Sequence, residues 1–316
     1  MAFQPSPAYS RLPPRKPDGD PRFLDLLVDD AGAADVLLAG VPYDGAVIGR
    51  KGCREGPSAI REAFRFLGAW DADRGTGLAG TRIHDLGDIP VRGEDTLATH
   101  RVVEKHLGEA LVEPKPLVVL GGDNSLSFAT FKALHGAYGG RWGVVVLDAH
   151  YDLRPHTGQP TSGTPYRRIL TEVEGRPVAG RNLAEVGIRP HANGAALAEY
   201  AAEQGVRVFP MGEVRRRGIA SVAKKALAAA GRGVDHIFLS VDIDGLDQSI
   251  ASGCSAPGAG GLAFHEAAHL VHAVASDPRC RAMDLVEVAP SLDPSGNTAR
   301  TAAQLVAACV GAWAAR

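Results

Sequence analysis

The chain has 316 residues, a hydrophobic share of 45% and a formal net charge of −2 at pH 7. This charge balance argues against nucleic acid as the main partner, and no apolar run approaches the length of a membrane span. The sequence does not start with a charged segment followed by an apolar one, and its four cysteines are scattered. We therefore expect a cytoplasmic protein with reduced thiols.

In chain order, residues 1–30 are rich in Pro, Arg and Asp, which predicts a loosely ordered N-terminal arm. Apolar runs typical of buried strands follow at residues 35–40, 82–86, 117–121, 143–148, 183–187, 206–209, 236–242 and 282–288. Helical patterns lie between them at residues 57–67, 96–111, 195–203, 219–230 and 264–275, and a last one covers 298–315. This alternation predicts an α/β three-layer sandwich, in which helices cover both faces of a mostly parallel sheet of about eight strands. Residues 31–316 are expected to form a single domain.

Acidic side chains follow two of the predicted strands. Residues 148–152 read Asp-Ala-His-Tyr-Asp and residues 242–244 read Asp-Ile-Asp. A single Asp-x-Asp would be ordinary turn chemistry, but the carboxyl ends of parallel strands meet at one sheet edge, where ligands bind. Bare carboxylates in an apolar setting are costly unless something positive pairs with them, and neither cluster contains Lys or Arg. The sequence therefore predicts metal ligands at Asp148, His150, Asp152, Asp242 and Asp244.

Carboxylates with one imidazole suit a hard divalent ion, and manganese fits better than zinc. Aspartates that bridge two ions would hold a shared water, whose lowered pKa makes it a nucleophile near neutral pH. The reaction class is then hydrolysis at an sp² carbon or at phosphorus. The sequence shows no phosphate-binding P-loop and no paired arginine clamp, which favours carbon.

The motifs at these positions resemble the ureohydrolase family, which includes arginase, agmatinase and formimidoylglutamase. The similar stretches are Gly-Gly-Asp-Asn-Ser at 121–125, Asp-Ala-His-Tyr-Asp at 148–152, Ser-Gly-Thr-Pro-Tyr-Arg at 162–167, Gly-Ile-Arg at 187–189, Ser-Val-Asp-Ile-Asp-Gly-Leu-Asp at 240–247, Ala-Pro-Gly-Ala-Gly-Gly-Leu at 256–262 and Val-Glu-Val at 286–288. They follow the family's order from about residue 35 to the end. The resemblance implies an arginase-like fold, two Mn²⁺ ions per subunit, and a homo-oligomer that is a trimer or hexamer.

Residue by residue, the resemblance makes Asp148 and Asp242 the carboxylates that bridge the two ions. It places His150 and Asp244 on one ion and Asp152 on the other. Catalytic roles fall to His150, Asp152 and Glu287, and Glu287 matches the acid that pairs with the cationic amidine or guanidine group. Asp152 could pass a proton to the departing amine.

Two positions depart from the family pattern. Asn124 stands where the family usually has His, so the ion at that position is expected to bind more weakly. Ser162 stands where the family motif His-Gly-Thr-Pro-Phe-Arg has its proton-relaying His. These departures are most similar to the formimidoylglutamase branch, which implies hydrolysis of N-formimidoyl-L-glutamate to L-glutamate and formamide.

The substrate's carboxylates call for cationic partners, because the arginine fork suits a carboxylate. Substrate contacts are assigned to Arg154, Ser162, Arg167, Arg189 and Glu287, with Arg168 as a further arginine near the strand ends. Asp123 is expected to support the ligands from behind, and Asp247 either does the same or caps a loop. A urea-releasing enzyme of the agmatinase or guanidinobutyrase type is an alternative. A metal-depleted, non-catalytic homologue that acts as a partner subunit is another.

Two further signals have competing interpretations. Residues 265–269 read His-Glu-Ala-Ala-His, which matches the zinc-peptidase helix, but a helix packed on the face of the sheet would put these side chains at a solvated surface. Cys53 and Cys254 both lie in predicted loops at the expected site mouth. They are either two unrelated small side chains or a redox pair that closes the site.

Overall fold

The computed structural model describes residues 2–6, 8–9, 19–91 and 93–316. Residues 10–18, in the middle of the predicted arm, lie outside the described residues, as do residues 1, 7 and 92. The flanking segments contact the rest of the chain. Gln4 pairs with Asp88 through backbone hydrogen bonds of 2.8 and 2.7 Å, and the buried ring of Phe23 packs against Phe64 at 4.6 Å between centroids.

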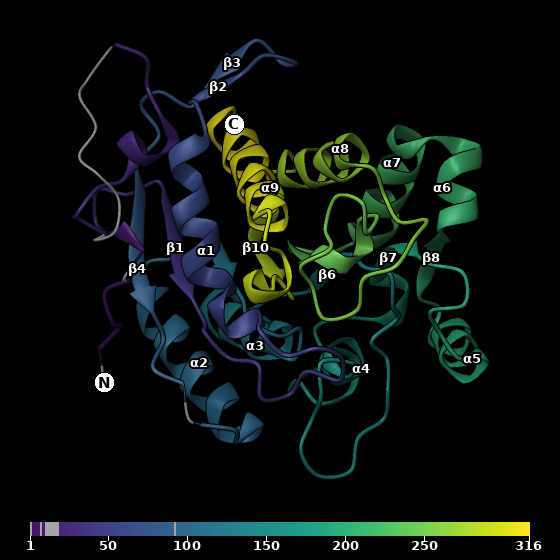
Figure 1. Ribbon diagram of the computed structural model, residues 1–316. Helices are drawn as coiled ribbons and strands as arrows, with labels where there is room; N and C mark the ends of the chain where they lie inside the picture. Colours follow the sequence, from purple (N-terminus) through teal and green to yellow (C-terminus); the bar gives the residue numbers. More distant parts are fainter. Residues whose placement is uncertain (1, 7, 10–18, 92) are drawn as a thin grey trace.

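An eight-stranded parallel sheet forms the centre of the described chain, in the order β4-β1-β5-β10-β9-β6-β7-β8 (Figure 1). Its strands are β1 (Val36–Gly40), β4 (Ile83–Asp88), β5 (Leu117–Leu120), β6 (Trp142–Leu147), β7 (Leu183–Ile188), β8 (Arg207–Pro210), β9 (His236–Asp242) and β10 (Cys280–Val286). Each corresponds to one of the eight predicted strands, so the predicted α/β three-layer sandwich is confirmed.

Helices cover both faces of this sheet (Figure 1). One face carries α1 (Gly56–Ala63), α6 (Met211–Arg217), α7 (Ile219–Ala230), α8 (Phe264–Ala275) and α9 (Asn297–Ala314), whose buried side chains form one apolar core with the strands. The other face carries α2 (Thr96–Ala110), α3 (Leu126–Tyr138), α4 (Pro165–Thr171) and α5 (Ala195–Gln204), which form a second core. Because strand side chains alternate between faces, the same strands supply both cores.

Some elements go beyond the sequence expectation. The six predicted helical stretches correspond to α1, α2, α5, α7, α8 and α9. Helices α3, α4 and α6 were not among them, nor was the small antiparallel pair β2 (Trp70–Asp71) and β3 (Thr76–Gly77). None of the helices in the described part of the chain combines the length and apolarity that a membrane span requires.

Candidate metal centre

Four adjacent strands bring the predicted site residues to one edge of the sheet. In the order β5-β10-β9-β6 they occupy its centre, and their carboxyl ends lead to Asn124, Glu287, Asp242 and Asp148 respectively. Parallel strands end at the same edge, so residues far apart in sequence converge there without any further folding device.

The backbone beyond the strand ends turns sharply, and the site carboxylates take part in these turns. The side chain of Asp148 accepts a hydrogen bond from the amide of His150 at 2.6 Å, and the side chain of Asp242 accepts one from the amide of Asp244 at 2.9 Å. Asp152 (φ 48°) and Glu287 (φ 68°) adopt the left-handed region, which is unfavourable for residues other than glycine. Strain of this kind is typical of functional sites whose surroundings hold the backbone in place.

Two groups of potential ligand atoms share Asp148. Asp148, His150 and Asp244 offer atoms that lie within 4.8 Å of one another, and so do Asp148, Asp152 and Asp242. His150 Nδ1 lies 3.4 Å from Asp148 Oδ1 and 3.2 Å from Asp244 Oδ2. The five predicted ligands are therefore close enough to serve a pair of ions with Asp148 between them.

The cluster carries more potential negative charge than positive charge. Burial raises the pKa of Asp148 to about 6, and burial together with neighbouring carboxylates holds the pKa values of Asp152 and Asp242 well above their usual range. Burial opposes protonation of His150, but Asp244 and Asp148 raise its pKa to about 11. Within the described chain, no Lys or Arg forms an ion pair with these side chains. One imidazole cannot balance four carboxylates, so the donor set fits divalent cations.

Asn124 and Glu287 lie beside the carboxylates and contact each other. The amide of Asn124 donates to Glu287 Oε1 at 2.7 Å, and Asn124 Nδ2 donates to Asp152 Oδ2 at 2.7 Å and lies 3.3 Å from Asp148 Oδ2. Burial and the charge of Asp123 raise the pKa of Glu287 to about 8, although a hydrogen bond from Ser255 opposes this. A cationic group next to Glu287 would favour its charged form.

A cavity of about 120 Å³ opens between these groups and the surface. Its walls include His150, Asp152, Arg154, Ser162, Asp242, Asp244, Ser255 and Glu287. The Oγ of Ser162 accepts a hydrogen bond from the amide of Ile48 at 3.2 Å, which leaves its proton available to donate. The cavity thus has acids at one end and an arginine at its rim.

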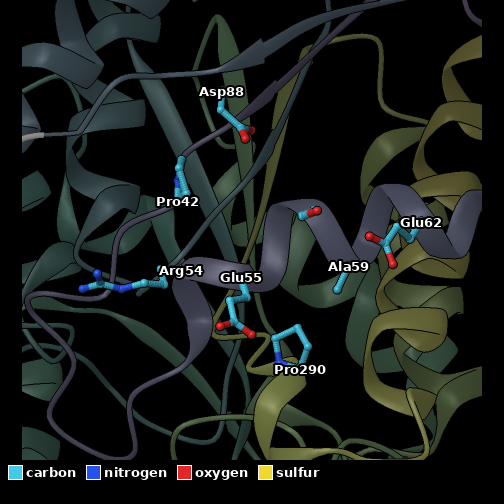
Figure 2. A pocket seen from close by; sticks show the side chains of 8 residues that line it. Pro42, Arg54, Glu55, Ala59, Glu62, Asp88 and Pro290 are labelled. Atoms are coloured by element: carbon cyan, nitrogen blue, oxygen red, sulfur yellow. The ribbon is translucent and has the colours of Figure 1, made fainter. Parts of the chain in front are cut away.

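A larger hollow of about 590 Å³ shares no wall residue with this cavity. Figure 2 shows Glu62 on α1 and Glu55 directly before the first residue of that helix, with Pro290 beside Glu55. Two of the charged side chains at its wall have partners, since Arg54 pairs with Asp44 and Glu94 and Asp88 pairs with Arg61. None of its wall residues belongs to the two groups of potential metal ligands.

The four candidate arginines differ in what their guanidinium groups contact. Arg189 donates to the main-chain oxygens of Asp244, Gly258 and Ala256 at 3.0–3.2 Å, and so braces the loop at the site mouth. Arg167 lies over the ring of Tyr200 at 3.9 Å, and Arg168 pairs with Glu172 and lies over Phe128.

Arg154 is exposed and lines the cavity, and in the described part of the chain its guanidinium has no hydrogen bond or ion pair. Gly163 makes room for its side chain, because a Cβ there would lie 2.6 Å from Arg154 Cδ.

The carboxylates of Asp123 and Asp247 accept hydrogen bonds from main-chain amides of loops. Asp123 is buried and accepts hydrogen bonds from the amides of Ala46 at 2.8 Å and Ser125 at 3.1 Å. Asp247 accepts from the amides of Ser249 and Gly260 at 3.0 and 2.6 Å. Both therefore stabilise loops that lie close in sequence to residues of the cavity wall.

Cys53 and Cys254 are both buried and free. The thiol of Cys53 lies 3.8 Å from Glu287 Oε2, and that of Cys254 lies 3.3 Å from the main-chain oxygen of Ala251. Burial raises the pKa of both thiols, that of Cys254 to about 12, which disfavours reactive thiolates. Their pairing stays a prediction.

The peptidase-like motif belongs to α8, which packs in the core layer of α7 and α9. His265 is exposed, and Glu266 Oε2 accepts a hydrogen bond from the amide of Ala263 at 2.9 Å. Glu266 thus stabilises the first turn of its own helix. Neither histidine of this motif belongs to a ligand group among the described residues.

Sequence reasoning missed a set of buried polar residues beneath Asn124. All four are buried: Ser127 in α3, Tyr166 in α4, Ser240 in β9 and Asp284 in β10. The signal available in the sequence was weak: Ser240 and Asp284 are single polar residues inside otherwise apolar strands.

Comparisons with known proteins agree with this geometry. The sequence model of the arginase family matches residues 34–311. A formimidoylglutamase of Halobacterium salinarum is 41% identical over 283 residues, which cover 88% of each chain. The crystal structure of formimidoylglutamase from Bacillus subtilis superposes with a TM-score of 0.89 at 32% identity and covers 97% of both chains. A Trypanosoma cruzi formiminoglutamase solved with Mn²⁺ gives 0.87 at 29% identity, over 94% of this chain and 99% of that one. With its sheet, its acidic cluster and these matches together, the chain belongs to the arginase family.

Proposed function

We propose that this chain hydrolyses the C–N bond of N-formimidoyl-L-glutamate, with water, to L-glutamate and formamide. The observation that carries the proposal is the cavity in which uncompensated carboxylates, Glu287 and the free guanidinium of Arg154 meet. The relatives named formimidoylglutamase support the choice of substrate. A urea-releasing activity on a guanidino substrate remains the alternative, and a non-catalytic partner subunit is the alternative of another class.

We propose Mn²⁺ as the cofactor, with two ions per subunit. Asp148 and Asp242 would bridge them, His150 and Asp244 would complete one site, and Asp152 would belong to the other, where Asn124 is the weaker ligand. When bound, such ions polarise the substrate and lower the pKa of water. A homo-oligomeric, cytoplasmic enzyme remains our expectation.

The chain's own residues position the substrate and move protons. Glu287 would hold the cationic amidine, because a buried carboxylate gains most from an adjacent positive charge. Asp152, at the cavity wall, would pass a proton to the departing amine. Arg154 at the rim would bind a carboxylate of the glutamate moiety through its two-pronged guanidinium.

The test is product release against a panel of substrates with the Mn²⁺-loaded protein. Formimidoylglutamate should yield formamide and glutamate, whereas the guanidino compounds arginine, agmatine and guanidinobutyrate should yield little urea. Urea release from a guanidino substrate at a higher kcat/KM would replace the proposal with its alternative. A protein that binds Mn²⁺ but turns over none of the four would support the partner-subunit interpretation.

Replacing Arg154 with alanine should raise KM for formimidoylglutamate with a smaller change in kcat. Charge-assisted hydrogen bonds contribute about 1.5–3 kcal/mol, which corresponds to roughly a 10- to 150-fold rise, and loss of a contact made equally in ground and transition states appears in KM. Steady-state kinetics provide the measurement. Arg154→Lys should be intermediate, and a simple N-alkylformamidine without carboxylates should be hydrolysed equally by all three proteins. An equal loss with that substrate would argue against carboxylate binding.

A further inference from the structure

A chain of buried hydroxyl groups leads from Asn124 to Ser240, whose neighbour on the next strand is a buried acid. Asn124 Oδ1 accepts a hydrogen bond from Ser127 Oγ at 2.8 Å and lies 3.4 Å from Tyr166 Oη. Ser240 Oγ lies 2.9 Å from Tyr166 Oη and 3.3 Å from Ser127 Oγ. Asp284 is the direct neighbour of Ser240 in the pairing of β10 with β9. All five side chains are buried, and we refer to Ser127, Tyr166 and Ser240 as the hydroxyl chain.

Asp284 is an unusual residue for its position. It lies within a strand between apolar neighbours, and in the described part of the chain no Lys, Arg or His forms an ion pair with it. Burial raises its pKa to about 7, and the hydroxyls of Ser240 and Ser127 act in the opposite direction. Among the described residues, neither of its two carboxylate oxygens has a hydrogen-bond partner. An unpaired buried carboxylate destabilises a core. Asp284 therefore does not contribute to the stability of the fold, and its role lies in what it does for neighbouring side chains.

The neighbouring side chain concerned is Asn124, whose amide can point either its oxygen or its nitrogen at the carboxylates. Its nitrogen now faces Asp152 and Asp148, but only an amide oxygen can bind a cation. Rotation of the amide by half a turn would bring the oxygen to the carboxylates and the NH₂ group to Ser127 and Tyr166. These hydroxyls would then accept hydrogen bonds from Asn124.

Each hydroxyl that accepts from Asn124 still has one proton to donate. Among the described residues, Ser240 lies within hydrogen-bond distance of both hydroxyls and can take these protons, with Asp284 behind it. A serine accepts and donates in turn, so the series must end in a group that only accepts. An ionised carboxylate is such a group, and Asp284 lies at that end.

We propose that Asp284, acting through the hydroxyl chain, is a positioning residue that turns the Asn124 carbonyl toward the metal ions. This inference rests on the proposed function, since it assumes that ions bind at the acidic cluster. It assigns the acid a role at a distance, because Asp284 itself does not line the cavity.

The test measures Mn²⁺ binding to the full-length protein rather than activity alone. Asp284→Asn keeps the shape but can donate toward Ser240, so it no longer enforces the direction of the chain. We expect the more weakly bound Mn²⁺ to lose affinity about 10- to 100-fold, as is usual when a group behind a ligand is removed. Equilibrium dialysis gives the number of ions bound, and electron paramagnetic resonance distinguishes a coupled pair from a single ion.

A matched control is available in another strand of the same sheet. Glu185 in β7 is also a fully buried acid without a hydrogen-bond partner among the described residues. Burial, together with the charges of Asp148 and Asp152, raises its pKa well above its usual range, and in the described part of the chain no hydrogen bond links it to Asn124. Because its charged form is disfavoured, Glu185→Gln should alter the binding of both ions much less than Asp284→Asn does. An equal loss in this control would show that any change in a buried acid weakens the site, and would overturn the proposal.

A second background separates positioning from simple destabilisation. In Asn124→Asp the side chain has an oxygen on both sides, so it needs no orientation. Asp284→Asn should then cost little additional Mn²⁺ affinity, whereas a merely structural role would cost the same in both backgrounds. If Asp284→Asn does not fold, Tyr166→Phe removes one link of the chain and should weaken the same ion severalfold.

The outcomes distinguish this inference from the proposed function. Unchanged binding of two Mn²⁺ ions by Asp284→Asn, or by a folded Tyr166→Phe where that variant is used, would overturn the positioning role. The wild-type protein would still load and release formamide, so the proposed function would stand. A wild-type protein that binds no pair of Mn²⁺ ions would overturn both.

Discussion

Asp148→Ala should lower kcat/KM by about 10³-fold or more and abolish the binding of a pair of Mn²⁺ ions. Asp148 is the one side chain shared by both ligand groups, so its loss affects both ions. Metal ions contribute several kcal/mol to such reactions, and each 1.36 kcal/mol corresponds to a factor of ten in rate. The metal-free variant should fold normally, because removing one of several crowded buried carboxylates relieves repulsion.

The control is His269→Ala on α8, which should leave formamide release and Mn²⁺ content intact. Thermal unfolding without metal checks that both variants are folded. The reverse pattern, with an inactive His269 variant and an active Asp148 variant, would favour a zinc peptidase over the proposed hydrolase.

Mn²⁺ should stabilise the folded protein more strongly as the pH rises from about 5 to 8. The folded pKa values of Asp148 and Glu287 lie at about 6 and about 8, above their ordinary values, chiefly because of burial. Without metal, the stability that these groups contribute is therefore full below about pH 4 and is lost as the pH rises through the folded values. His150, with its pKa raised to about 11, adds to this loss above about pH 6.5.

Cations reverse this trend, because they bind the deprotonated ligands. Free Mn²⁺ at 100 times Kd contributes about 2.7 kcal/mol per site, so two sites should raise Tm by on the order of 10 °C near neutral pH. Calorimetry over a pH series, with and without Mn²⁺, measures the difference. A Tm increase that is equal at pH 5 and pH 8, or that persists in Asp148→Ala, would contradict binding at the acidic cluster.

Much of the architecture could be read from the sequence, because the signal is local. Most of the eight strands are short apolar runs between turn residues, and burial on both faces requires such runs. Strands β4 and β8 are partly exposed and contain polar residues. Helix α3 was not predicted from the sequence, because most of its side chains are buried and it therefore lacks an amphipathic pattern. The strands β2 and β3 have two residues each, too few for any periodicity.

The sequence by itself determined that carboxylates end two strands, and the rule that parallel strands end at one edge was enough to predict that they meet. Only the tertiary structure decided which arginine is free, because Arg189 and Arg167 carry the same charge as Arg154 yet contact main-chain oxygens and an aromatic ring. It also decided that Asp284 lies behind Asn124, some 160 positions away in the chain. The physical reason is that the chain's own periodicity specifies strands and faces, whereas partners across layers depend on packing between distant segments.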